Sequence, residues 1–264
     1  MTESSTDFAG GTTISGQVAP EEYTSQYKPT LVDRWDDLID WDRRKASENN
    51  FFVELLKEAE SRRVLDAAAG TGFHSVSLAE AGFEVTAVDG SRKMLDRAAA
   101  NARREGQSFE IIHTDWRGLG ENLDGRYDAI VCLGSSFPHL FDEADRRAVL
   151  AEFYEALNPG GMLILDHRNF DAIRAHRYRS SGNFYYCGTG ANVSVAHIDE
   201  NLCRFRYDFP DGATYHLEVY PVLKDELTGL LLQSGFDTTQ TFGDFQEKFD
   251  IFASDFIIHV ARKA

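Results

Sequence analysis

The order of apolar and polar positions along this chain predicts alternating strands and helices. Short apolar runs are separated by longer segments in which apolar residues recur every three or four positions, the spacing of an amphipathic helix. Strands that alternate with helices in this way form a parallel sheet with right-handed crossovers. The expected strands are 63–67, 84–88, 109–113, 127–133 and 162–166, joined by helices at 73–81, 91–104 and 143–157. A helix at 224–234 and strands at 237–242 and 255–261 would complete a seven-stranded sheet.

Other parts of the chain depart from this alternation. Residues 1–20 are rich in Thr, Ser and Gly, whereas 23–57 carry apolar and aromatic residues at helical spacing, which predicts two helices packed over the sheet. Between 183 and 220, short stretches alternate aromatic with polar residues, and Pro210-Asp-Gly212 provides a hairpin turn. The expected strands of this small antiparallel sheet are 184–187, 202–209 and 214–220. The predicted organisation is a tail at 1–20, a helical cap at 21–60, a Rossmann-like α/β domain at 61–171 and 222–264, and an inserted β-sheet lid at 172–221.

A glycine turn follows the first strand and is the strongest local motif. Asp66 precedes Gly70 and Gly72 in a D-x-x-x-G-x-G pattern, and Asp89 ends the second strand, where a carboxylate can accept both hydroxyls of a ribose. A dinucleotide fingerprint would have a third glycine where this chain has Ser75. The pattern instead resembles motif I of class I S-adenosylmethionine-dependent methyltransferases. The alternative is a tight turn that binds no ligand.

Composition and charge narrow the function. The formal net charge is −16 at pH 7, and no run of Lys and Arg offsets it, so the surface repels phosphate backbones and disfavours a nucleic-acid substrate. The same acid excess suits a protein that works in high salt; the alternative is an ordinary soluble acidic enzyme. Cys132, Cys187 and Cys203 form no C-x-x-C pair, which is typical of a reducing compartment. Without an apolar stretch of membrane length or a leader pattern, we expect a cytoplasmic protein that does not bind membranes; the oligomeric state stays open.

Two polar segments follow the fourth and fifth strands, where the substrate of such a fold would lie. They are Leu133-Gly-Ser-Ser-Phe-Pro-His139 and Asp166-His-Arg-Asn-Phe-Asp171. Arg168 stands at the carboxyl end of a central strand, where a guanidinium can hold a carboxylate through two hydrogen bonds. The alternative role for Arg168 is a structural salt bridge to Asp166 or Asp171. We expect no metal site, since neither His139 nor His167 has ligand partners at metal spacing.

These two segments, together with Trp35-Asp-Asp-Leu-Ile-Asp-Trp41, Gly70-Thr-Gly-Phe-His-Ser75, Gly243-Asp-Phe245 and Phe256-Ile-Ile-His-Val260, resemble the glycine N-methyltransferase family. The resemblance is greatest to its bacterial glycine/sarcosine branch, whose members begin glycine betaine synthesis. It implies a class I methyltransferase sheet with a β-sheet lid, and S-adenosylmethionine as the methyl donor, with S-adenosylhomocysteine as product. The implied reaction methylates glycine to sarcosine and sarcosine to dimethylglycine.

The resemblance also implies roles for individual residues. Arg44 would bind the carboxylate of the cofactor, Asp89 its ribose, and Arg168 the carboxylate of glycine or sarcosine. The other implied cofactor residues are Trp35, Ala67, Gly70, Asp115, Trp116, Leu133, Ser136 and Tyr186. The other implied substrate-side residues are Tyr27, Gly134, Ser135, His139, Tyr207 and Tyr220.

One departure from the family pattern leaves the acceptor open. Ser135 stands where the family usually has an asparagine whose amide helps to hold the amino acid. A second hypothesis is therefore methylation of another small amine or amino acid. A third is a non-catalytic sensor of S-adenosylmethionine, which the presence of Arg168 disfavours because a sensor needs no second pocket.

Overall fold

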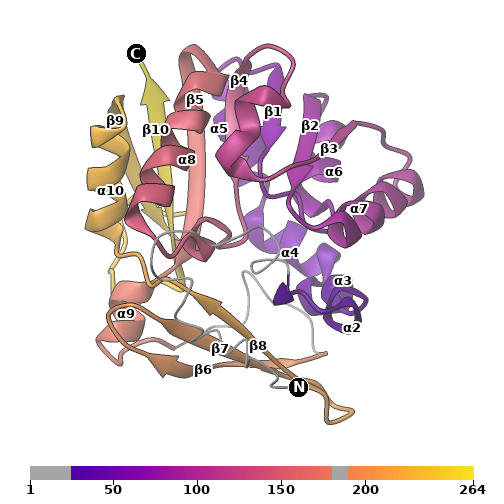
Figure 1. Ribbon diagram of the computed structural model, residues 1–264, viewed down its shortest axis with the longest axis vertical. Helices are drawn as coiled ribbons and strands as arrows, with labels where there is room; N and C mark the ends of the chain where they lie inside the picture. The colour runs from indigo at the N-terminus through magenta and orange to yellow at the C-terminus, as the bar shows by residue number, and fades with distance from the viewer. Residues whose placement is uncertain (1–24, 180–189) are drawn as a thin grey trace, which may run out of the picture.

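The computed structural model describes residues 25–179 and 190–264, and its centre is a seven-stranded sheet with the order β3-β2-β1-β4-β5-β10-β9 (Figure 1). Strands β1 to β5 run parallel, whereas β10 is antiparallel to both β5 and β9. The strands are β1 Arg63–Asp66, β2 Glu84–Asp89, β3 Glu110–His113, β4 Tyr127–Cys132, β5 Leu157–Arg168, β9 Phe236–Gly243 and β10 Phe256–Lys263. The predicted seven-stranded Rossmann-like sheet is confirmed.

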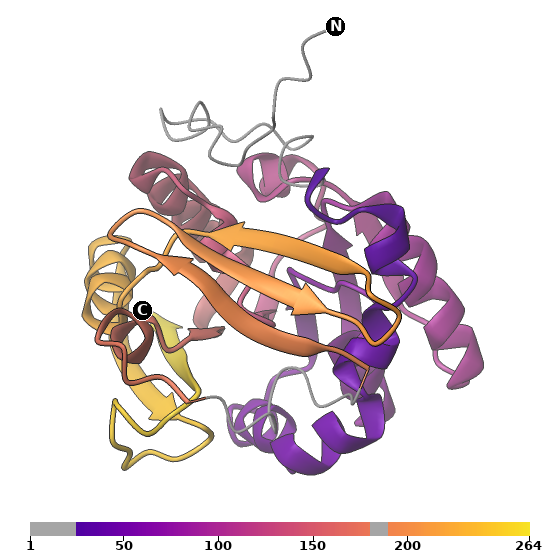
Figure 2. The ribbon, with the colours of Figure 1, turned by 90° about the horizontal axis from the view of Figure 1, so that it is seen from below.

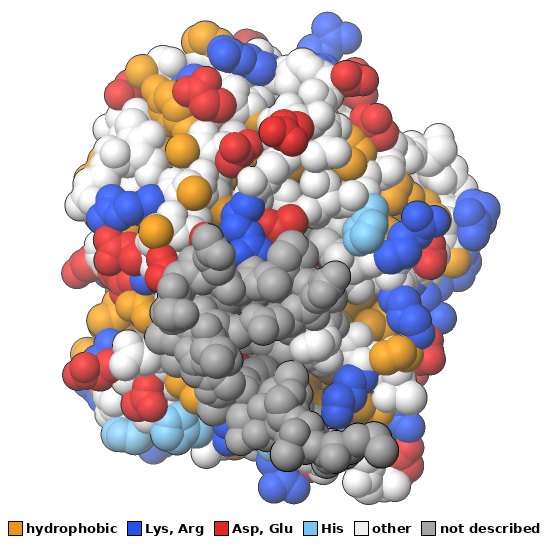
Figure 3. Space-filling view, viewed as in Figure 1, with side chains coloured by type: hydrophobic (Ala, Val, Ile, Leu, Met, Phe, Trp, Pro, Cys, Tyr) orange, Lys and Arg blue, Asp and Glu red, His pale blue; other side chains and the backbone are white. Residues whose placement is uncertain are grey.

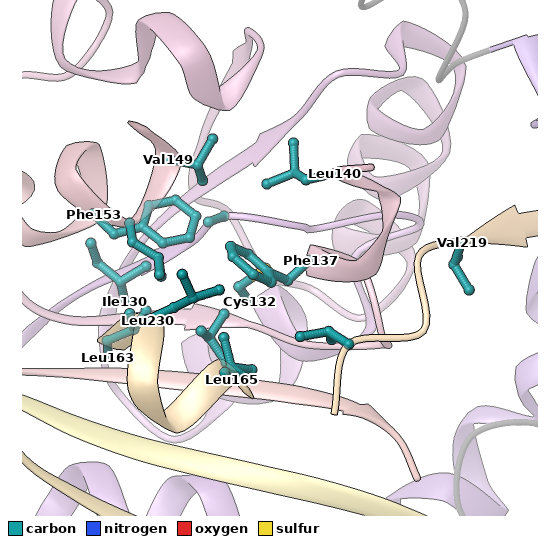
Figure 4. Packing of buried hydrophobic residues seen from close by; sticks show 14 of the residues in the cluster. Ile130, Cys132, Phe137, Leu140, Val149, Phe153, Leu163, Leu165, Val219 and Leu230 are labelled. Carbon is teal, nitrogen blue, oxygen red and sulfur yellow. The ribbon is translucent and has the colours of Figure 1, made fainter. Parts of the chain in front are cut away.

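Helices cover both faces of this sheet because its central strands bury side chains on both sides. Leu65 points to the face covered by α8 (Glu143–Ala156) and α10 (Lys224–Gln233), where Phe153 and Leu230 join the same buried cluster (Figure 4). Val64, the preceding residue, points to the opposite face and packs with Phe52. Each fully buried side chain of this size contributes about 1.5–3 kcal/mol. The remaining elements of the domain are α6 Phe73–Glu80, α7 Arg92–Arg104, α9 Phe170–Arg174 and the short 3-10 helices η2 Trp116–Glu121 and η3 Phe137–His139.

The N-terminal region differs from the prediction of two helices. It forms four short ones: α2 Pro29–Val32, α3 Trp35–Ile39, α4 Trp41–Glu48 and α5 Phe51–Glu58. Asp40, Asn49 and Asn50 have φ angles of 53°, 44° and 61°, a left-handed conformation that Asp and Asn tolerate and that ends a helix. Helix α5 packs on the sheet through Phe52 and Leu56. Leu31 of α2 and Leu38 of α3 belong to the other buried cluster, which includes side chains of the large sheet and of the lid.

The lid is a three-stranded antiparallel sheet of β6 Asn192–Ile198, β7 Cys203–Asp208 and β8 Thr214–Val219. It lies across the end of the large sheet where the parallel strands finish (Figures 1 and 2). Leu31 of α2 and Leu38 of α3 share a buried cluster with its side chains, and Arg34 forms an ion pair with Asp211 of its hairpin turn. The cap and the lid are thus one packed unit over the sheet edge.

The lid prediction was right for two strands and incomplete for the third. Strands β7 and β8 match the expected segments, whereas β6 was not predicted, and the expected strand at 184–187 lies outside the described residues. In β6, Val193 and Val195 alternate with exposed residues, and both pack against the main cluster. That alternation was a signal for a strand.

Charged side chains of both signs are interspersed on the face shown in Figure 3. Among the described residues, no helix has the length and apolar character needed to cross a bilayer. Cys132 and Cys203 are buried free thiols, and Cys187 lies outside the described part of the chain.

Candidate active site

The glycine turn and Asp89 form one hydrogen-bonded unit at the end of β1 and β2. The Gly70 N–H donates to Asp89 Oδ2 over 2.9 Å, and the Ser91 N–H donates to Oδ1 over 2.7 Å. Burial raises the pKa of Asp89 to about 6, although these two N–H groups oppose the shift. Asp66 is buried behind the turn and accepts a hydrogen bond from the Ser75 hydroxyl over 2.6 Å, which ties β1 to α6.

The two glycines of the motif serve different purposes. Gly70 has φ +53°, and a Cβ added there would meet nothing within 4 Å, so the space beside it is open to a ligand. Gly72 has φ +92°, and its Cβ would lie 3.0 Å from the Ala98 Cβ and 3.1 Å from the Ala98 Cα. Gly72 therefore allows α6 and α7 to pack closely.

A pocket opens beside this turn. Most of the predicted cofactor residues meet there although they are distant in sequence. Those that line the pocket are Trp35, Arg44, Gly70, Asp89, Leu133 and Ser136, and the substrate-side candidates Tyr27 and Gly134 also line it.

A second pocket continues from the first, since Asp89 lines both. It is lined by three more predicted cofactor residues, Ala67, Asp115 and Trp116, and by His139. The Trp116 indole Nε1 donates to the Ala67 carbonyl over 2.5 Å, and this bond orients the ring. The Asp115 carboxylate is bound by Arg117 at 2.7 Å, and Arg117 also pairs with Asp145 at 3.0 Å.

Arg168 lies at the carboxyl end of β5 and is 95% buried. Its Nη1 donates to the Tyr178 hydroxyl over 2.8 Å, and its Cζ lies 4.7 Å from the centre of the Phe205 ring in the lid. Arg168 also lines an open cavity between β6 and Tyr178. A buried guanidinium that faces a cavity is suited to an anionic ligand.

Ser135 joins the Arg168 region to the first pocket. It stands between Gly134 and Ser136, both of which line that pocket, and its Oγ accepts the Arg168 backbone N–H over 3.1 Å. The Ser135 N–H donates to Asp166 Oδ1 over 2.8 Å. The φ angle of Ser135 is +59°, a left-handed conformation that serine adopts at a cost, held here by these bonds to β5.

The predicted pocket tyrosines lie in different surroundings. Tyr27 forms a hydrogen bond of 2.7 Å with His139 Nε2, and burial lowers the pKa of His139 to about 3, so its ring is neutral at pH 7. Tyr207 is 1% exposed in the middle of the lid, and the ring of Tyr220 lies 3.8 Å from the Arg146 Cζ. Neither Tyr207 nor Tyr220 lines the two pockets or the cavity beside Arg168, so their assignment to the substrate stays a prediction. Tyr186 lies outside the described residues.

The structure adds residues that sequence reasoning missed. Glu48 binds both Arg44 and His74, Tyr178 holds Arg168, and Arg117 binds Asp115. The spacing of Arg44 and Glu48, four residues apart on one helix, was a detectable signal. The contact with His74 depends on the packing of α6 against α4. Within the described residues, no group of three or more His, Cys, Asp or Glu side chains could hold a metal.

Comparisons with known proteins agree with this geometry. A family model described as a methyltransferase domain matches residues 64–161. A structure of an S-adenosylmethionine-dependent methyltransferase from Clostridium acetobutylicum superposes with a TM-score of 0.68 at 18% identity, covering 89% of this chain and 98% of that one, which shows a shared fold. The fold and the two joined pockets define a class I S-adenosylmethionine-dependent methyltransferase.

Sequence relatives define the family within that class. The glycine/sarcosine N-methyltransferase of Halorhodospira halochloris is 52% identical over 92% of this chain and 91% of its own length. The enzyme of the same description from Aphanothece halophytica is 48% identical over 92% of each chain. The chain belongs to the glycine/sarcosine N-methyltransferase family.

The residues present fit S-adenosylmethionine. The buried Arg44 lines the first pocket, Asp89 lines both pockets, and the Trp116 indole lines the second. These groups match the carboxylate, the ribose hydroxyls and the adenine ring of the cofactor in kind.

Proposed function

We propose that this protein methylates the amine of glycine to give sarcosine and then methylates sarcosine to give dimethylglycine. The observation that carries this proposal is the buried guanidinium of Arg168, a residue whose backbone N–H is bound by Ser135, next to Gly134 and Ser136 in the wall of the cofactor pocket. A free amino acid offers a carboxylate for Arg168 and, two bonds from the carboxyl carbon, an amine that reaches back toward that pocket. Repeated methylation of glycine leads to betaine, and we propose these reactions as its first two steps.

Arg44 would hold the carboxylate of the cofactor, Asp89 its ribose and Trp116 its adenine, while Leu133 and Ser136 would border the reacting centre. S-adenosylmethionine supplies the methyl group for a direct displacement by the amine. The chain contributes chiefly by placing the amine close to that carbon and in line with it, and such positioning can lower a barrier by about 7–11 kcal/mol.

The amine must be neutral to react, and the charges of the site favour this. Glycine arrives as an ammonium, and the positive charge of Arg168 disfavours a second cation nearby, which lowers the pKa of the bound amine. The proton can leave to water, so no dedicated base is required. Tyr27, held against the neutral ring of His139, is placed at the pocket wall, where its hydroxyl can orient the amine.

Ser135 favours a second candidate, a different small amine or amino acid as acceptor. Its short hydroxyl already accepts the Arg168 N–H over 3.1 Å, and it reaches less far than an asparagine amide would. A slightly larger acceptor could therefore fit beside it. Carboxylate binding at Arg168 would be common to both candidates if the acceptor is an amino acid.

The direct test incubates the purified protein with S-adenosylmethionine and, separately, glycine, sarcosine and dimethylglycine, and identifies products by mass spectrometry. Sarcosine and dimethylglycine formed from glycine would support the proposal. If only other small amines are methylated, the second candidate would replace glycine as the acceptor. Cofactor binding without any methylated product would favour a sensor. Arg168→Lys keeps the charge but loses the bidentate hydrogen bonding of the substrate carboxylate, so glycine turnover should fall at least tenfold.

A further inference from the structure

The Arg44 guanidinium is held from behind by a buried carboxylate. Arg44 Nε donates to Glu48 Oε1 over 2.7 Å, one helical turn away on α4, and the two residues are 5% and 8% exposed. The bond is made at Nε, so it fixes the plane of the guanidinium and the direction in which its Nη atoms point. The Arg44 Cζ also lies 5.4 Å from the centre of the Phe73 ring, which supports the flat group from one side.

A histidine from α6, outside the N-terminal cap, binds the same carboxylate oxygen. His74 Nε2 lies 3.0 Å from Glu48 Oε1, and His74 is the second residue of α6, directly after the glycine turn. Its ring packs edge-on against Phe73, at 4.9 Å between ring centres, and against Phe52 of α5, at 5.6 Å. The cluster of Arg44, Glu48 and His74, here called the Arg44 cluster, therefore joins the N-terminal cap to the helix that follows the glycine turn.

Glu48 and Arg44 line different cavities. Arg44 lines the first cofactor pocket and Glu48 does not; Glu48 lines an adjoining cavity together with Lys45 and Glu80, and His74 lines both. Burial raises the pKa of the Glu48 carboxyl, but His74 and Arg44 outweigh burial, so the pKa lies below its usual value and Glu48 is ionised at neutral pH. A charged group outside the pocket lining acts through Arg44 and not by touching the cofactor.

We propose that Glu48 and His74 are positioning residues that aim the Arg44 guanidinium at the carboxylate of S-adenosylmethionine. The inference rests on the proposed role of Arg44. Since one oxygen of Glu48 receives both contacts, losing either partner frees the carboxylate to rotate and with it the guanidinium. Through the Arg44 cluster, binding of the amino-acid end of the cofactor therefore requires that the N-terminal cap is docked on α6.

The test compares two ligands that differ only at that end. S-adenosylhomocysteine carries the carboxylate, whereas 5′-deoxy-5′-methylthioadenosine carries the same nucleoside without the amino-acid end. Dissociation constants measured by titration calorimetry on Glu48→Gln and His74→Leu should rise about tenfold for S-adenosylhomocysteine and less than twofold for methylthioadenosine. His74→Gln keeps an N–H donor and should stay within about threefold of the unaltered protein for both ligands.

The matched control is Glu80→Gln, which makes the same charge change in the adjoining cavity, where Glu80 pairs with Lys45 and not with Arg44. It should change neither constant. An equal loss for both ligands in Glu48→Gln and His74→Leu would mean that the cluster only maintains the shape of the cleft, and no loss for either would mean that it has no role; both results overturn the proposal.

The Arg44→Ala variant tests the role of Arg44 in binding the cofactor carboxylate separately from the positioning role of Glu48 and His74. If Arg44→Ala weakens S-adenosylhomocysteine selectively while Glu48→Gln and His74→Leu do not, the positioning inference fails and the role of Arg44 stands. If Arg44→Ala has no selective effect, the role of Arg44 itself is wrong. The KM for glycine at saturating cofactor should stay unchanged in the Glu48 and His74 variants, because the defect lies at the other ligand.

Discussion

The Gly70 N–H and Asp89 Oδ2 lie 2.9 Å apart, so the glycine turn of β1 and the carboxylate that ends β2 hold each other in place. A second N–H, from Ser91, occupies the other oxygen of Asp89. The carboxylate is therefore preorganised before any ribose arrives, and each oxygen keeps further lone pairs for a hydroxyl donor.

Asp89 makes cofactor affinity dependent on pH. Its pKa in the free protein is about 6, above the usual value of a carboxyl, so below pH 6 it carries a proton that must leave before it can accept two hydroxyls. Affinity for S-adenosylhomocysteine should therefore weaken as pH falls from 7 to 5, approaching tenfold per pH unit at the acid end. Calorimetry in matched buffers measures it.

The control for this prediction is Asp89→Asn, which has no proton to lose. It should bind about 10–100-fold more weakly at pH 7, as expected for losing charged hydrogen bonds, and should show no step near pH 6. Constant affinity of the unaltered protein between pH 5 and 7 would contradict the assignment.

The two glycines of the turn should respond differently to alanine. Gly72→Ala forces a Cβ to within 3.0 Å of Ala98 and retains φ +92°, so we expect about 2–4 kcal/mol of lost stability in urea denaturation. Gly70→Ala meets no atom within 4 Å and should cost about 1–2 kcal/mol from its conformation alone. Its main effect should be at least tenfold weaker cofactor binding, because Gly70 lines the pocket. Equal stability losses with unchanged affinity in Gly70→Ala would show that the ligand does not approach this turn.

Ser135→Asn should improve the binding of glycine. Asparagine adopts the left-handed φ of +59° more readily than serine, and its longer amide can donate to a substrate carboxylate. We expect the KM for glycine to fall about two- to tenfold, the value of one added hydrogen bond. Ser135→Ala, which removes the acceptor of the Arg168 N–H, should raise it. A higher KM for glycine in Ser135→Asn would indicate a pocket shaped around the hydroxyl and would favour a different acceptor.

The buried pair His167 and His259 should make stability fall in acid. Their Nε2 atoms lie 3.1 Å apart, and burial lowers the pKa of His167 to about 4 and that of His259 well below its usual value. The unfolded chain titrates near pH 6.5, so it binds protons that the folded protein does not. The contribution of the neutral pair to the free energy of unfolding is therefore complete above pH 6.5 and is lost as the pH falls toward 4. His167 alone accounts for about 3 kcal/mol of this loss.

Urea denaturation at pH 7, 6 and 5 measures this loss, and the comparison is with the double variant His167→Asn/His259→Asn. The variant should be less stable at pH 7 but should lose less stability between pH 7 and 5 than the unaltered protein. Carboxyls such as Asp89, whose pKa is raised in the folded protein, change the stability in the opposite direction over the same pH range. They contribute equally to the unaltered protein and to the variant. Parallel pH profiles would show that the pair does not titrate in this way.

The sequence by itself determined the parts of this protein that depend on local pattern. Alternating apolar runs and helical spacings placed the seven strands of the sheet, because strands buried on both faces and amphipathic helices each require their own periodicity. The glycine turn and the carboxylate ending the second strand were evident for the same reason, since their positions follow from the ends of predicted strands. Resemblance to a family added residues such as Arg44 and Trp35, which local pattern alone would leave unassigned.

Tertiary structure decided what depends on contacts between distant segments. Two of the three breaks between the four helices of the cap lie at residues in the left-handed conformation, Asp40 in one and Asn49 and Asn50 in the other, which helical spacing in the sequence does not reveal. The different purposes of Gly70 and Gly72 became visible only when Ala98 was placed beside one of them. Likewise, Glu48 and His74 meet because α4 docks on α6, and no periodicity in the sequence encodes a contact between side chains 26 residues apart.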